Sequence, residues 1–195
     1  MNIAKVEISK SHMAAIDSYC LANYHKREGV STIFRSKTPY ASYKAGVMGE
    51  VVVADYCMGS DIGEYLENRP AGKADIFDVT LNDGRKWDVK TMLAVTPVLQ
   101  PFYHCDVAET QLSHLVAGFI FCSILQTREK VIQPIAFIKG YLEKPKFLDV
   151  AIKRAEGYQA SNNYQAPCAC RDVELQQLDD VHGLISYGQK VLALL

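Results

Sequence analysis

Several side chains that could act on a phosphate group or bind a metal ion gather between residues 75 and 90. The triplet Asp88-Val89-Lys90 places a carboxylate and an ammonium two positions apart, and Asp75 and Asp78 precede it. Side chains alternate along a β-strand, so Asp88 and Lys90 point to one face if the triplet is extended. Hydrolysis of a phosphodiester is the chemistry that these residue types suit.

A β-hairpin is predicted to bring these residues together. Residues 74–81 and 86–93 are two short strand-like runs, and Asp83-Gly84 between them is typical of a tight turn. With Asp83 and Gly84 as the two central turn residues, Val79 faces Asp88. The hairpin and its register follow from this turn.

The register decides which carboxylate joins Asp88 and Lys90. In the two-residue turn, Asp75 shares their face of the hairpin, whereas Asp78 has the opposite parity unless a bulge intervenes. Asp75 is therefore the expected partner. Glu50, in the preceding helical segment, could approach the same face from the side.

A set of two or three carboxylates beside a lysine suits a Mg²⁺-dependent reaction. Carboxylate oxygens bind Mg²⁺ while leaving positions for water and phosphate, and the carbonyl of Val89 is a natural additional ligand. The metal polarises the phosphoryl oxygen and lowers the pKa of its bound water. An ammonium beside it can orient the attacking water and offset charge in the transition state. The alternative is that these polar side chains form an ordinary strand face exposed to solvent.

The order of these residues resembles that of the PD-(D/E)XK nuclease superfamily, which has the restriction-endonuclease-like fold. The resemblance covers roughly residues 41–140. The matching segments are Gly49-Glu50, Gly72-Lys73-Ala74-Asp75 and Trp87-Asp88-Val89-Lys90-Thr91. Two positions depart from the pattern: Ala74 stands where many members have proline, and Asp88 replaces the commoner glutamate.

The resemblance implies a metal-dependent nuclease, with DNA as the expected substrate and an endonuclease as the expected type. It implies that Asp75 and Asp88 bind Mg²⁺, for which Mn²⁺ could substitute, that Lys90 serves the water, and that Glu50 ligates or positions the metal. Candidate phosphate contacts are Lys26, Arg27, Arg35, Lys37 and Lys44, with Lys139, Lys144 and Lys146 on the far side. The alternative is a non-cleaving nucleic-acid-binding or assembly module that retains the fold. A homodimer would supply two sites for the two strands of a duplex.

The periodicity predicts a single α/β domain over residues 1–195, with a mixed central β-sheet flanked by helices. The expected helices are 11–27, 40–57, 106–115, 148–157 and 173–194, and 60–73 is expected to be a loop. Residues 116–125 form an apolar run typical of a strand buried on both faces. Residues 131–138 follow as a strand, in which Pro134 indicates an edge or a bulge.

Composition narrows the function classes. The chain has 195 residues with 21 basic and 22 acidic side chains, and its net charge is −1. This excludes a strongly basic protein that coats nucleic acid through its overall charge. No apolar run is long enough to cross a bilayer and the amino terminus lacks a signal-like core, so a cytoplasmic or nucleoid-associated protein is expected. Of six cysteines, Cys20, Cys57 and Cys122 have apolar surroundings typical of buried thiols. A metal on the remaining Cys and His residues is the third hypothesis.

Overall fold

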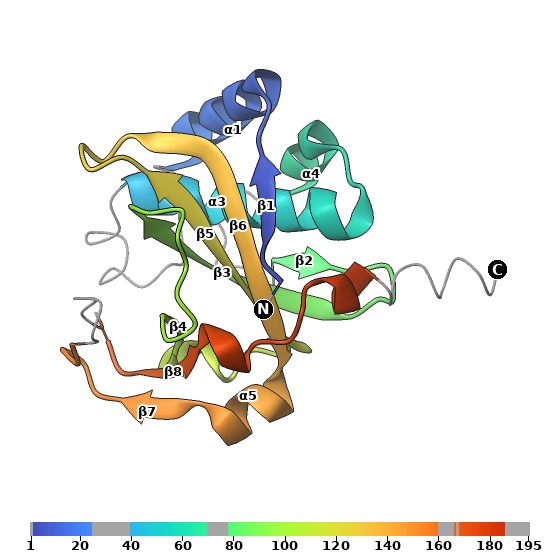
Figure 1. The fold of residues 1–195 in the computed structure, drawn as a ribbon. Helices are drawn as coiled ribbons and strands as arrows, with labels where there is room; N and C mark the ends of the chain where they lie inside the picture. The colour runs from blue at the N-terminus through green and yellow to red at the C-terminus, as the bar shows by residue number, and fades with distance from the viewer. Residues whose placement is uncertain (1, 25–39, 70–77, 160–165, 167, 186–195) are drawn as a thin grey trace.

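The computed structural model describes residues 2–24, 40–69, 78–159, 166 and 168–185 (Figure 1). The strands are β1 (Ala4–Glu7), β2 (Val79–Thr80), β3 (Lys86–Ala94), β4 (His104–Ala108), β5 (Gly118–Gln126), β6 (Ile132–Glu143), β7 (Ile152–Arg154) and β8 (Cys170–Glu174). The helices are α1 (Lys10–Asn23), α3 (Tyr40–Met58), α4 (Ile62–Asn68) and α5 (Lys144–Val150), with 3-10 turns η2 (Glu109–Gln111) and η3 (Leu175–Gln177).

The main sheet has five strands in the order β1-β6-β5-β3-β2. The pair β3–β5 is parallel and the other pairs are antiparallel, so the sheet is mixed, as predicted. The central strand β5 is buried from Gly118 to Ile124, which confirms the prediction from its unbroken apolar sequence. Figure 1 shows the long strand β6 curling across the sheet.

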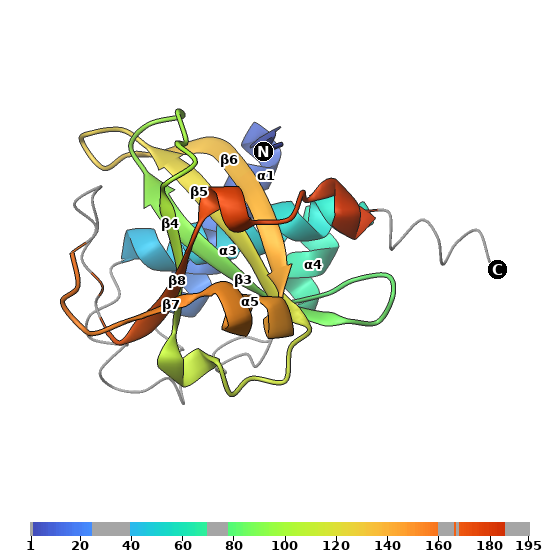
Figure 2. The same ribbon diagram turned by 60° about the horizontal axis from the view of Figure 1, so that its bottom comes forward.

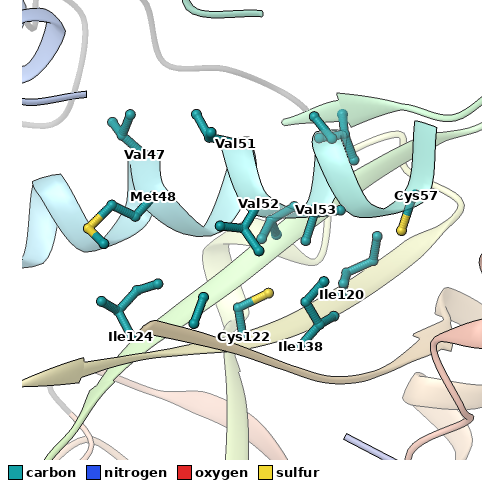
Figure 3. Packing of buried hydrophobic residues seen from close by; sticks show 14 of the residues in the cluster. Val47, Met48, Val51, Val52, Val53, Cys57, Ile120, Cys122, Ile124 and Ile138 are labelled. Carbon is teal, nitrogen blue, oxygen red and sulfur yellow. The ribbon is translucent and has the colours of Figure 1, made fainter. Parts of the chain in front are cut away.

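One face of the main sheet is covered by α3. Valine and methionine side chains of this helix pack on alternate residues of β5 and β6, as Figure 3 shows for Val52, Cys122 and Ile138. Helix α3 is buried on every side from Val47 to Ala54, because α1 and α4 pack against it from outside. The apolar run from Val51 to Ala54 is therefore a core segment, and it gives the following strands a fixed support.

The opposite face carries a second, three-stranded sheet in the order β4-β8-β7. The β5 residues that alternate with the α3 contacts, Phe119 and Phe121, pack on Phe147 of α5 and on residues of this smaller sheet such as Cys105 and Val173. Figure 2 views the molecule from this side, with β7, β8 and α5 before the main sheet. The molecule thus has a helical layer, a mixed sheet and a small sheet.

The expected elements that the structure replaces lie mostly in this second layer. Residues 106–115 are not a helix, because 104–108 form β4 and pair with β8. The helix expected over 148–157 begins earlier, as α5, and gives way to β7. The start of the 173–194 helix is instead β8, and 186–195 lie outside the described residues.

The amino-terminal half of the chain differs less from the elements predicted from the sequence. The helices predicted at 11–27 and 40–57 are confirmed with shifted ends, while residues 60–73 contain α4 in place of a continuous loop. Asp61 caps α4 by accepting a hydrogen bond from the Glu64 amide at 3.0 Å. Pro134 lies where the β5–β6 register shifts, so the predicted irregularity is confirmed.

Gly49 allows α3 to approach β3 closely. A Cβ built at Gly49 would lie 1.9 Å from Thr91 Oγ1 and 3.0 Å from Thr91 Cβ. Rotating the threonine does not relieve the second contact. At Gly46, on the same helix, nothing lies within 4 Å of a built Cβ. The glycine before Glu50 thus sets the spacing between helix and sheet.

We predict opposite effects on stability from alanine at these two glycines. Gly49→Ala should lower the free energy of unfolding by about 1–3 kcal/mol, because the added methyl overpacks the contact with Thr91. Gly46→Ala should raise it by up to about 1 kcal/mol through helix propensity. Chemical denaturation of both variants measures this, and equal effects would mean that the close approach is not a packing constraint.

Candidate active site

The hairpin forms as predicted, but its turn is one residue longer. Val79 pairs with Trp87 and Thr80 with Lys86, and the amide of Leu81 donates to the carbonyl of Arg85 at 2.9 Å. The turn therefore contains three residues, 82–84. Gly84 has a φ of +79°, which fits a three-residue hairpin turn that ends in a left-handed residue.

This register contradicts the expectation that Val79 faces Asp88. Beyond Val79 the regular pairing does not continue, because the Asp78 amide donates to the Trp87 carbonyl at 2.9 Å, and the side-chain Oδ2 of Asp78 accepts a hydrogen bond from the Val89 amide at 2.6 Å. Asp78 thus lies at the Asp-x-Lys triplet. Asp75 lies outside the described residues, so its role remains a prediction.

The carboxyl of Asp78 is held among like charges. Burial raises its pKa well above the ordinary value, and the negative charges of Glu50 and Asp88 raise it further, while Lys90 lowers it. Hydrogen bonding with the nearby carboxyl of Asp88 also raises the pKa of Asp78. The two carboxyls therefore form a site that favours a proton or another cation.

Asp88 connects this pair to two basic side chains. It is 4% exposed and forms an ion pair with Lys90 through Oδ1. Its Oδ2 lies 3.8 Å from Nδ1 of His114, too far for a hydrogen bond, and neither atom has a hydrogen-bond partner in the described part of the chain. Two buried polar atoms with unmet bonding capacity thus face each other beside the carboxyl pair.

No motif in the sequence marks His114 as part of the site. The signal that could have placed it is the parallel pairing of β3 and β5. Parallel neighbours begin at the same end of the sheet, so the residues before β5 meet the start of β3. The hydrogen bond from the Ala117 amide to the Lys86 carbonyl, at 2.7 Å, belongs to this junction.

Glu50 reaches the same region from α3, but both of its oxygens are engaged by Arg69. Nε and Nη2 of Arg69 donate to Oε2 and Oε1 of Glu50 at 2.6 and 2.9 Å, and Nη1 donates to the Tyr19 hydroxyl at 3.0 Å. This is a forked, charge-assisted pair in a protected position. Glu50 is thus held in place beside Asp78, and its predicted role as a metal ligand is untested.

The fit of a divalent cation can be judged from these atoms. Within the described ranges, no three His, Cys, Asp or Glu side chains are grouped closely enough to form a metal site on their own. Mg²⁺ requires fewer, because it is commonly held by one or two carboxylates with waters and substrate oxygens completing its shell. Asp78 and Asp88 fit this description, given the raised pKa of Asp78 among like charges and the unpartnered Oδ2 of Asp88.

The carbonyl of Val89 also fits. The amide and carbonyl of one residue point to the same side of an extended strand, and the Val89 amide points at the Asp78 carboxylate. Its carbonyl is thereby directed toward the edge of β3 where the paired part of β2 has ended at Val79.

The predicted phosphate-contacting residues are mostly outside the described residues, as Lys26, Arg27, Arg35 and Lys37 are. Lys44 is described and is paired with Asp17. On the far side, Lys144 donates to the carbonyl of His114 at 2.7 Å and Lys146 to Asp179 at 2.5 Å. These described lysines all have protein partners, and their predicted contacts with nucleic acid stay untested.

The cysteines do not form disulfides, and Cys20, Cys57 and Cys122 are buried as predicted. The third hypothesis, a metal on the remaining Cys and His side chains, finds no cluster of three such ligands in the described segments. No helix among the described residues has the length and apolarity needed to cross a membrane.

Comparison of the chain with models of protein families, with curated proteins and with solved structures finds no match. The resemblance to the PD-(D/E)XK superfamily therefore rests on the residues themselves.

The carboxyl pair generates a prediction for Asp78→Asn. The native protein binds a proton at Asp78 more tightly than the unfolded chain does, so wild-type stability should fall as pH rises from about 4 toward the raised pKa. Asparagine removes this dependence. The difference in the free energy of unfolding, variant minus wild type, should therefore increase as pH rises, by at most about 1.4 kcal/mol per pH unit.

Denaturation at pH 5 and pH 8, with EDTA or with MgCl₂, measures both halves of this prediction. Mg²⁺ should stabilise wild type more at pH 8, because at lower pH it must displace a proton from Asp78, and Asp78→Asn should lose most of that gain. The control is Asp149→Asn, an exposed carboxylate on α5. A pH dependence of Asp78→Asn identical to that of wild type would contradict the raised pKa of Asp78.

Proposed function

We propose that this chain is a Mg²⁺-dependent nuclease that hydrolyses phosphodiester bonds in DNA, with Asp78, Asp88 and Lys90 at its centre. The observation that carries the proposal is the pair of carboxyls, Asp78 and Asp88, held together beside the ammonium of Lys90. Two neighbouring carboxylates are stabilised by a divalent cation, and phosphodiester hydrolysis uses such a cation.

The roles of the side chains follow from their positions. Asp78 and Asp88 would hold Mg²⁺, with the Val89 carbonyl as a further oxygen ligand and Glu50 fixed behind Asp78 by Arg69. When bound, the metal would polarise the phosphoryl oxygen and acidify a water. Lys90 would place positive charge beside the attacking water and the phosphate. Asp88 would keep that ammonium in place through their ion pair.

An open pocket beside this centre offers room for a substrate strand. Its volume is about 360 Å³, and Lys90, Thr91 and Met92 of β3 line it together with residues of β4 and β6. Lys90 therefore lies between the carboxyl pair and an accessible space. This arrangement favours a cleaving enzyme over the alternative of a non-cleaving module, since such a module needs no lysine at this point.

Replacing Lys90 with alanine should nearly abolish cleavage while leaving DNA binding and stability close to wild type. The lysine acts mainly on charge that develops in the transition state, so its removal should lower the rate of cleavage and leave DNA affinity unchanged. The expected decrease in the single-turnover rate is ~10²–10³-fold at saturating Mg²⁺. The measurement uses plasmid and single-stranded DNA, with affinity and thermal melting recorded in parallel.

The matched control is Lys86→Ala, on the same face of β3 but at its exposed end near the turn. It should cost little, because its charge is farther from the carboxyl pair and more screened. A Lys90→Ala variant as active as wild type would remove this lysine from the mechanism. Absence of Mg²⁺-dependent cleavage by wild type on both substrates would favour the non-cleaving module.

Comparing Asp75→Asn with Asp78→Asn in the same assay distinguishes the two candidates for the first carboxylate. The register predicts the larger loss of rate for Asp78→Asn. If Asp75→Asn alone abolishes cleavage, the metal is held by the carboxylate that the family resemblance implies, and Asp78 acts only through its charge.

A further inference from the structure

A second lysine is directed toward the pocket by a bulge in β6. Phe121 of β5 pairs with Gly140, but the next residue, Cys122, pairs with Ile138, so Lys139 is an extra residue in the ladder. Gly140 has a φ of +145°, and a Cβ there would lie 2.5 Å from the Asp179 carbonyl oxygen. This bulge is thus built around a glycine, and bulges commonly redirect a side chain beside a functional site.

Lys139 is 2% exposed, which is unusual for lysine. No ion pair among the described residues includes it, in contrast to Lys44, Lys90 and Lys146. Its neighbour is the thiol of Cys105, with which it forms a hydrogen bond. Burial raises the pKa of the Cys105 thiol despite the opposing effect of Lys139, so the sulfur stays neutral and does not balance the ammonium.

Burial of an ammonium without a carboxylate partner is costly, and a structure retains it where another anion completes the site. Lys139 lines the same 360 Å³ pocket as Lys90, together with the residues Ser42, Thr91 and Gln111. One carboxylate, Asp106, also lines the pocket. Lys90 and Gly140 both align with Phe121, one strand to either side, so the two lysines are about 10 Å apart in backbone position.

We propose that this pocket binds a phosphate group of the substrate strand, with Lys139 as its buried cation, next to the phosphate that is cleaved beside Lys90. The proposal rests on the proposed nuclease function for the identity of the ligand as nucleic acid. The pocket lies between the main sheet and β4, and Lys139 lies at its base rather than on the surface. It recognises a phosphate oxyanion, which either a strand end or an internal diester can supply.

The first test uses inorganic phosphate and needs no cleavage activity. Phosphate at 10 mM, against chloride of equal ionic strength, should raise the melting temperature of wild type by about 2–4 °C. Lys139→Met keeps the length of the side chain and removes its charge, so it should melt higher than wild type without phosphate and respond little to it. Lys153→Met, an exposed lysine on β7, is the control and should respond as wild type does.

Gln111→Glu provides a second variant on a partly exposed 3-10 turn, where folding is not at risk. It adds a carboxylate to the pocket wall and should also reduce the response to phosphate. Equal responses of wild type, Lys139→Met and Gln111→Glu would overturn the proposal, as would a wild type that does not respond at all.

The second test measures binding to DNA in the presence of Ca²⁺ as a non-catalytic cation. Lys139→Met should weaken binding roughly tenfold and lower the slope of log affinity against log salt by about 1. If the ligand is a terminal phosphate, affinity should fall only for oligonucleotides that carry a 5′- or 3′-phosphate. If the ligand is an internal phosphodiester, affinity should also fall for closed circular DNA. Unchanged affinity on every substrate contradicts the proposal, whereas a wild type that binds phosphate but cleaves nothing contradicts only the nuclease.

Discussion

The three-residue turn of the β2–β3 hairpin determines most of what the candidate site can do. Gly84 takes a left-handed conformation that closes the loop one residue later than a two-residue turn would. Because side chains alternate, that single residue exchanges the two faces of the first strand relative to the second. Asp78 consequently lies beside the Asp88-Val89-Lys90 triplet, where its Oδ2 accepts a hydrogen bond from the Val89 amide and its pKa responds to the charges of Glu50, Asp88 and Lys90.

Two cations in this region show different solutions to burial. The guanidinium of Arg69 is matched by both oxygens of Glu50 and by the Tyr19 hydroxyl, so its charge is satisfied within the protein. Lys139 is comparably withdrawn from water, yet its neighbour is a neutral thiol. The first arrangement fixes α4 against α3 and serves the fold. The second leaves positive potential available to a ligand of the pocket.

Sequence reasoning was most successful where the signal was local. The boundaries of α3 and the burial of β5 follow from periodicity and from an unbroken apolar run, and the hairpin follows from Asp83-Gly84. The same dipeptide is compatible with turns of two and three residues, however, and tertiary contacts decide between them. Contacts such as Arg69 with Glu50 join residues that no short-range pattern relates.

The strands of the second sheet could not be predicted from the sequence, for a related reason. Residues 106–115 and 173–194 have mixed composition that suits a helix when taken alone, but the first residues of each segment belong to β4 and β8, which pair across some 65 positions of sequence. The same long-range pairing hides His114 from sequence patterns, since only the parallel β3–β5 alignment brings it to Asp88. Helix and hairpin are thus readable locally, whereas the site is completed by topology.

The pairing of β1 with β6 has a consequence for synthesis on the ribosome. Ala4 aligns with Ile138, so β1 has no partner strand until β6 has been made, more than 130 residues later. Contacts of such separation carry a large loop-closure cost and form late. The face of the main sheet that holds Lys90 and Lys139 is covered later still. The small sheet over that face is completed by β8, which follows at residues 170–174. A nascent chain therefore acquires its helical layer first, and its pocket is completed only after β8 has been made.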